Sequence, residues 1–149
     1  MEINGIAHIA LVVNRFELCV PFYEALLSFL GLKCVFKGQD NIYYVGGKTA
    51  VGVGRAAADQ QNEKFIQTRI GLHHLCFRAR SREDVDTLYR FLLEIKAKII
   101  HPPEDGPWGP GYYSVLFEDP DGIRLEMNYV EGKGVLAEGV KFNPAGDYT

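Results

Sequence analysis

Two short stretches decide the fold of this 149-residue chain, GIAHIALVV at residues 5–13 and GLHHLCFRA at residues 71–79. Glycine stands against glycine, His8 stands against His74, and apolar residues recur at matching positions. Both stretches alternate as β-strands do, with successive side chains on opposite faces. Each predicted strand therefore has an apolar face for a covering helix and a second face that carries a histidine.

The segments that follow the two stretches also match each other. Asn14 and Ser81 stand at predicted helix starts, and an acidic residue lies three positions after each of them, as is typical of a helix N-cap. Pro21 favours a first helix that begins near Val20, with the proline in the first turn, where its missing amide hydrogen is tolerated. Three short strand-like runs follow each predicted helix, at residues 33–37, 41–45 and 49–53 and at residues 98–101, 112–118 and 123–129.

This order of elements predicts an α+β fold that consists of two β-α-β-β-β modules. A length of 149 residues suits a single domain, with module one at residues 1–55, a polar linker at residues 56–68 and module two at residues 69–130. Residues 131–149 form a predicted C-terminal tail. Sheets with helices on one face leave the other face free to line a cleft.

Composition narrows the class of function. The chain is 47% hydrophobic and 23% charged, with a formal net charge of −3, which excludes a disordered chain and argues against a nucleic-acid-binding protein. No apolar run reaches the ~20 residues that span a bilayer, and the first residues do not have the pattern of a secretory signal. Three cysteines without a CxxC spacing suggest reduced thiols. We expect a cytoplasmic protein that binds a small molecule rather than nucleic acid or a membrane.

Three polar residues lie on faces turned away from the predicted core. His8 and His74 occupy equivalent places in the repeat, and alternation along the last predicted strand puts Glu126 on the matching face. Two imidazoles and one carboxylate are a metal-ligand set that leaves positions open, as in zinc hydrolases and non-haem iron oxygenases. Taken singly, each residue also fits a structural histidine or a solvated glutamate, so the prediction depends on the three occurring together.

The chain resembles the vicinal oxygen chelate superfamily, which includes glyoxalase I, bleomycin-resistance proteins, fosfomycin-modifying thiol transferases and extradiol dioxygenases. The resemblance covers about residues 3–130 and rests on the repeated module, the Gly-x-x-His strand openings, Phe22-Tyr23 and the segment EDPDGIRLE at residues 118–126. It implies two paired modules that form a U-shaped metal-binding cleft. The implied ligands are His8, His74 and Glu126, and nitrogen and oxygen donors suit Zn, Mn, Ni or Fe(II).

The sequence departs from part of that family. Glyoxalase I and methylmalonyl-CoA epimerase, another member of the superfamily, use a further ligand in the first module, where this chain has Val51 and Gly52. This difference favours a three-ligand enzyme of the thiol-transferase or dioxygenase type over a two-carboxylate isomerase (lyase type). A module that binds an aromatic ligand or a drug without turnover is the alternative. By analogy with this family, we also expect a homodimer, and the paired modules close a cleft either within one chain or between two.

Other residues carry weaker predictions. Arg124 is predicted to hold an anionic substrate group or to be solvated, and Tyr113 is predicted to donate a hydrogen bond to a substrate oxyanion; Tyr112 and Tyr113 must have opposite faces. Cys76 shares a face with His74, and it is predicted to be either a thiol that faces the metal or a small side chain that fills the wall of the cleft. The stretch 102–111, which contains the single tryptophan, is either the edge of the cleft or a plain connector.

Overall fold

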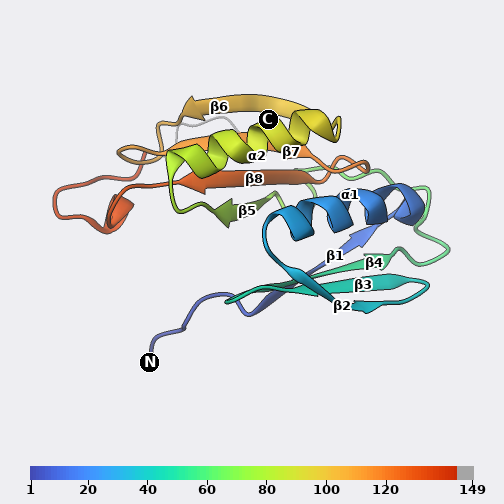
Figure 1. Cartoon of the computed structure of the whole chain (residues 1–149). Coiled ribbons are helices and arrows are strands. Elements are labelled where there is room, and N and C mark those ends of the chain that lie inside the picture. Colours follow the sequence, from blue (N-terminus) through green and yellow to red (C-terminus); the bar gives the residue numbers. More distant parts are fainter. Residues whose placement is uncertain (144–149) are drawn as a thin grey trace. The chain divides into compact units, whose positions relative to one another are not determined.

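The computed structural model describes residues 1–143, and it divides the chain into two compact units, residues 1–65 and residues 66 onward (Figure 1). Each unit contains one sheet and one helix that covers it. The last six residues of the predicted tail, 144–149, lie outside the described part. Within the described part, no helix is long and apolar enough to cross a membrane.

The first unit is one β-α-β-β-β module. Its four strands form a sheet in the order β1-β4-β3-β2, in which β1 and β4 run parallel and the other neighbours antiparallel. The elements are β1 His8–Val13, α1 Phe16–Phe29, β2 Lys33–Lys37, β3 Asn41–Val45 and β4 Ala50–Arg55.

The second unit repeats this topology. Its sheet has the order β5-β8-β7-β6. The edge strand β5 runs parallel to its neighbour β8, and the other neighbours are antiparallel. The elements are β5 Leu75–Arg78, α2 Arg82–Glu94, β6 Lys98–Asp105, β7 Tyr113–Glu118, β8 Arg124–Tyr129 and the short 3-10 helix η1 Gly134–Leu136. The two modules confirm the predicted α+β fold.

Alternation along the strands decides which face of each sheet is covered. Leu11 and Val13 of β1 are buried, whereas His8, Ala10 and Val12 of the same strand are exposed. In the second unit, α2 contacts β6, β7 and β8, and its buried stripe faces apolar side chains of the sheet. The core of this unit contains Val85, Leu88, Leu92, Val115, Phe117, Leu125 and Met127. Burial of this apolar area is the main stabilising contribution to each unit.

The start of the first helix differs from the prediction. α1 begins at Phe16 rather than near Val20, and Pro21 lies inside it; Arg15 is the N-cap and makes no side-chain cap hydrogen bond. Phe16 and Cys19 are both buried, so packing of the first turn against the sheet offsets the backbone hydrogen bond that Pro21 removes. In α2, the predicted cap is confirmed, because Ser81 Oγ accepts a hydrogen bond from the Asp84 amide at 3.1 Å.

Strand β6 is longer than predicted, because it continues through Pro102 and Pro103 to Asp105. Two register shifts, between Ile99 and His101 and between His101 and Glu104, interrupt its pairing with β7. Since β6 lies at the edge of the sheet, the missing amide hydrogens of the prolines face no partner strand on one side. Bulges and an edge position thus permit two prolines in a strand.

The turn between β7 and β8 sets the register of β8. Asp119 is buried, and its Oδ1 accepts hydrogen bonds from the amides of Asp121 at 2.9 Å and Ile123 at 2.8 Å. Gly122 has a φ of +88°, a conformation that favours glycine. The turn therefore aligns β8 so that Glu126 lies opposite Leu116 of β7 and beside Cys76 of β5.

We expect Asp119→Ala to lower the free energy of unfolding by about 1–3 kcal/mol, because two backbone amides lose their acceptor. Urea denaturation followed by circular dichroism measures this loss. Asp119→Asn is the matched control and should retain most of the stability, since its amide oxygen accepts the same two hydrogen bonds. An equal loss in both variants would show that the charge, rather than the acceptor geometry, holds the turn.

Candidate functional site

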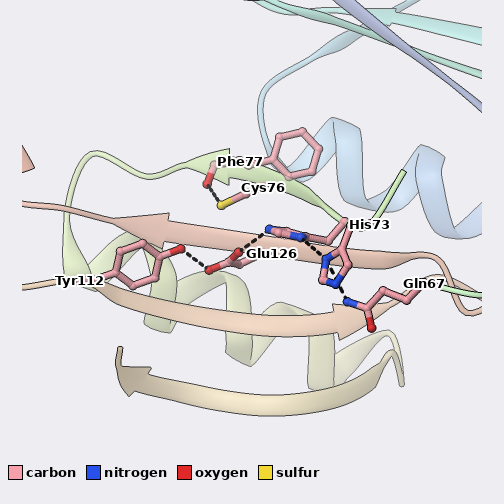
Figure 2. Close-up of polar contacts among 7 residues, drawn as sticks. Gln67, His73, Cys76, Phe77, Tyr112 and Glu126 are labelled. Carbon is pink, nitrogen blue, oxygen red and sulfur yellow. Dashed lines mark hydrogen bonds and ion pairs between the residues drawn. The ribbon is translucent and has the colours of Figure 1, made fainter. Parts of the chain in front are cut away.

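Glu126 is the most unusual side chain in the second unit, because it is a carboxylate that is only 1% exposed. Alternation along β8 turns it away from the core residues Leu125 and Met127. A buried charge is costly unless it is paired and hydrogen-bonded. Tyr112 meets part of this requirement, since its hydroxyl donates a hydrogen bond to Glu126 Oε1 at 2.6 Å (Figure 2).

The second carboxylate oxygen is in a different situation. Glu126 Oε2 is buried and has no hydrogen-bond partner among the described residues. His74 Nε2 lies 3.3 Å from it, without the geometry of a hydrogen bond. The imidazole of His74 therefore lies close to Glu126 Oε2, but this oxygen still lacks a hydrogen bond.

A row of polar contacts continues from His74 away from Glu126 (Figure 2). His74 Nδ1 lies 2.8 Å from His73 Nδ1, which lies 3.2 Å from the amide nitrogen of Gln67. With the amide placed in this way, its nitrogen only donates, so His73 Nδ1 is an acceptor and carries no hydrogen. The roles of the two ring nitrogens depend on the tautomer of each imidazole. In the tautomer that donates from His74 Nδ1 to His73, Nε2 of His74 is unprotonated and faces Glu126.

Two electron-rich atoms, His74 Nε2 and Glu126 Oε2, consequently lie side by side, and a cation bound by both would remove their mutual repulsion. Metal–ligand bonds of about 2.0–2.2 Å in a tetrahedral arrangement place two ligand atoms roughly 3.4 Å apart. The observed separation is 3.3 Å. Nitrogen and oxygen donors in this arrangement fit a divalent transition metal, and they provide two of its ligands.

The charge of Glu126 suits this role. Burial raises the pKa of Glu126, but its contacts with His74, Tyr112 and Ser114 outweigh burial and hold the pKa below its ordinary value. The contribution of His74 is that of a ring with a proton on Nε2, and a bound cation would take the place of that proton. The side chain is therefore a carboxylate at neutral pH, the form that binds a metal.

Cys76 is the register partner of Glu126 in the adjacent strand. Burial raises the pKa of its thiol, and the nearby negative charge of Glu126 raises it further. The side chain thus stays protonated at neutral pH, and Sγ contacts the carbonyl oxygen of Phe77 at 3.5 Å. These observations favour the interpretation of Cys76 as a small filler of the wall rather than a thiolate ligand.

The two neighbouring tyrosines are placed on opposite faces, and the structure brings Tyr112, not Tyr113, to Glu126. The hydroxyl of Tyr113 donates to Asp86 Oδ1 of α2 at 2.7 Å, and the guanidinium of Arg82 lies 3.8 Å from the centre of its ring. Tyr113 is therefore engaged on the helix side, contrary to the predicted arrangement. The sequence did not indicate His73, and it did not distinguish Tyr112 from Tyr113. The available signal was that adjacent tyrosines lie on opposite faces, so only one of them can face Glu126.

Arg124 lies two residues before Glu126 on β8, but it already has a partner. Its Nη1 is 3.1 Å from Oε1 of Glu118, the residue opposite it on β7, an ion pair without the geometry of a hydrogen bond. Lys98 Nζ is 2.7 Å from the other oxygen of Glu118. The side chain of Arg124 is 17% exposed. This ion-pair network connects β6, β7 and β8 and gives Arg124 a structural role in the sheet.

His8 lies in the first unit, at the start of β1, where it pairs in register with Ala50. Within residues 1–143, no group of three or more His, Cys, Asp or Glu side chains gathers around a metal position. The structure thus brings together His74 and Glu126 of the predicted triad. The contribution of His8 stays a prediction.

The first unit contains no counterpart of Glu126. Cys76 pairs with Glu126 in the second unit, and the matching pair in the first unit is Ala10 with Gly52. A Cβ atom on Gly52 would lie 3.1 Å from the ring of Tyr43. The position where a second carboxylate would stand is therefore closed by an aromatic side chain.

Comparisons with known proteins give one consistent family. A family model described as the Glyoxalase/Bleomycin resistance protein/Dioxygenase superfamily matches residues 5–127. The uncharacterized protein YqjT of Bacillus subtilis is 29% identical over 123 residues, which cover 80% of this chain and 94% of YqjT. The crystal structure of a candidate glyoxalase from Bacillus halodurans is 31% identical, with a TM-score of 0.75, and the match covers 85% of this chain and 96% of that one.

A more distant solved structure, lactoylglutathione lyase from Agrobacterium tumefaciens, shares the fold. It is 20% identical, with a TM-score of 0.63, and the match covers 87% of this chain and 96% of the lyase. At this identity, the similarity concerns the fold alone and leaves the reaction open.

The depressed pKa of Glu126 predicts how stability depends on pH. Because the folded pKa lies below the ordinary value of 4.5, ionised Glu126 contributes stability above about pH 4.5, and that contribution is lost as the pH falls through the folded pKa. We expect the stability difference between the metal-free wild type and Glu126→Gln to increase as the pH rises through the folded pKa and to level off above about pH 4.5. Urea unfolding at a series of pH values measures it. A difference that decreases with rising pH would mean that burial dominates and that the carboxyl is protonated.

Proposed function

The chain belongs to the Glyoxalase/Bleomycin resistance protein/Dioxygenase superfamily, and on that premise we propose that it is a divalent-metal-dependent enzyme whose small-molecule substrate chelates the ion through two neighbouring oxygens. The observation that carries this proposal is the pair His74 Nε2 and Glu126 Oε2, 3.3 Å apart, with the buried oxygen unsatisfied. A purely structural ion pair would instead be hydrogen-bonded through a proton on Nε2. In the tautomer that donates from His74 Nδ1 to His73, that proton is on the other ring nitrogen, and Nε2 is open to a cation.

In this proposal, His74 and Glu126, together with His8, hold the ion. A bound Zn, Mn, Ni or Fe(II) ion supplies Lewis-acid stabilisation of the negative charge that develops on a substrate oxygen. The chain's own residues position the ligands. Tyr112 binds one carboxylate oxygen and so leaves the other directed to the metal, and His73 orients the imidazole of His74 and fixes its tautomer.

The first unit narrows the type of reaction. With Gly52 in place of a second carboxylate, the site does not have two carboxylates that could exchange protons with a substrate. We therefore infer a reaction of the thiol-transferase or dioxygenase type, in which the metal would stabilise negative charge and a thiol or oxygen would react with the substrate. A two-carboxylate isomerisation does not fit this site.

One observation favours a second function. An aromatic-lined cavity of about 240 Å³ lies next to Tyr112, and such a cavity also suits a module that binds an aromatic ligand without turnover. Metal content separates the two functions. Protein purified without chelator that holds no divalent ion, and that gains no thermal stability from Zn, Mn, Ni or Fe(II), would support the binding module.

We expect the wild type to hold about one divalent ion per chain by elemental analysis, and Glu126→Ala to hold none. Neutral imidazoles supply no negative charge, so the loss of the carboxylate removes both a ligand and the charge that balances the ion. Glu126 faces away from the core, so the variant should fold. Thermal unfolding with and without added metal is the second measurement.

Leu125→Ala is the matched control one residue away. Leu125 is fully buried in the core, so this variant should lose about 2–5 kcal/mol of stability and keep its metal. His8→Ala should bind metal more weakly without a change in the stability of the apo protein, because His8 is exposed. Retention of metal by Glu126→Ala would contradict the proposed site.

We also propose that the chain functions as a homodimer, because two such modules pair to form a complete cleft either within a chain or between chains. We expect static light scattering to give twice the chain mass of 16.7 kDa at micromolar concentration. A chain-sized particle over the whole concentration range would contradict the dimer.

A further inference from the structure

A cavity of about 240 Å³ lies within the second unit, between the loop at residues 106–112, the end of β5 and the segment that follows β8. An engineered cavity of about 150 Å³ is large enough to bind benzene, so this one accommodates an aromatic ring with a substituent. Aromatic and aliphatic side chains form most of its wall. They include Trp108, Tyr112, Val130, Val135 and Phe142.

The aromatic wall is held in place by the loop. The indole of Trp108 lies against Gly106, where a Cβ atom would collide with the ring, and its ring centre is 4.9 Å from that of Tyr112. The Gly106 amide donates to the carbonyl of Tyr112 at 2.9 Å, and the Tyr112 amide donates to the carbonyl of Gly109 at 3.2 Å. The two rings are thus arranged edge to face before any ligand binds, which lowers the entropic cost of binding a third ring.

Charge at the cavity has one sign. Within residues 1–143, Arg78, at the end of β5, and Lys133, after β8, are the charged residues of its lining, and no acidic side chain lines it. Arginine and lysine bind carboxylates through charge-assisted hydrogen bonds. An aromatic wall with two cations therefore suits a ligand that combines a ring with an anionic group.

Tyr112 belongs both to this cavity and to the candidate metal site, since its ring lines the cavity and its hydroxyl donates to Glu126 (Figure 2). We propose that the cavity binds the ring of an aryl carboxylate, with Arg78 and Lys133 at its anionic group, and that this class of compound is the substrate of the site. The second part of this proposal rests on the proposed function, because it requires that the chelating oxygens of the same molecule reach the ion held by His74 and Glu126.

Trp108 is the single tryptophan of the chain, so its fluorescence reports the occupancy of the cavity directly. In metal-stripped protein, we expect a saturable change with benzoate and binding that is at least about fivefold weaker for benzamide, its neutral isostere. Arg78→Gln should weaken benzoate binding by about threefold to tenfold and leave benzamide binding unchanged. Arg80→Gln, an exposed arginine two residues away that does not line the cavity, should leave both unchanged.

The absence of a saturable change with benzoate in folded protein, or equal effects of the Arg78 and Arg80 variants, would overturn the proposed cavity. The link to the metal is tested separately with 4-(hydroxycarbamoyl)benzoate, which carries a ring, a carboxylate and a chelating group with two neighbouring oxygens. We expect zinc to tighten its binding by at least about tenfold in the wild type and not in Glu126→Ala. Selective benzoate binding without this tightening, in protein that holds its divalent ion, would overturn the link and support the cavity as an aryl carboxylate site, whereas protein that holds no divalent ion would overturn the proposed function itself.

Discussion

The burial of one carboxylate is the constraint on which the second unit is built. Glu126 is 1% exposed, and a charge in that position persists only if the surrounding chain compensates for lost hydration. The Asp119 turn sets the register of β8, and Tyr112 binds Oε1. His74 approaches Oε2 at 3.3 Å. These three contributions come from a turn, a loop and the residue before a strand, so the whole β-α-β-β-β module is needed to assemble them.

The two modules share one topology but only one of them carries this constraint. In the first unit the equivalent pair is Ala10 and Gly52, and the ring of Tyr43 lies against Gly52. Because the first module buries no carboxylate at this position, it does not need a tyrosine or a histidine to bind one there. The repeat thus preserves the scaffold, whereas the buried carboxylate and its partners lie in the second unit, with His8 as the predicted contribution of the first.

Alternation and turn residues made most of the fold predictable from the sequence. Strand faces are set by a period of two residues, so the apolar faces of β1 and β8 and the orientation of Glu126 follow from the sequence alone. Features that depend on tertiary packing did not: α1 begins at Phe16 because the sheet buries its first turn. The choice between Tyr112 and Tyr113 depends on where β7 begins, and a shift of one residue exchanges the two faces. His73 lies outside the strands, so alternation says nothing about its contact with His74.

The position of Tyr112 also limits what the site does with charge. A tyrosine hydroxyl has one hydrogen to donate, and in this structure that hydrogen is donated to Glu126 at 2.6 Å. Tyr112 therefore does not have a second hydrogen for an oxyanion on a substrate, and Tyr113 is bonded to Asp86 on the other face. Arg124 is paired with Glu118. Since each of these nearby donors faces an anionic partner from the chain, the proposed function assigns the balancing of charge on a substrate chiefly to the cation that His74 and Glu126 would hold.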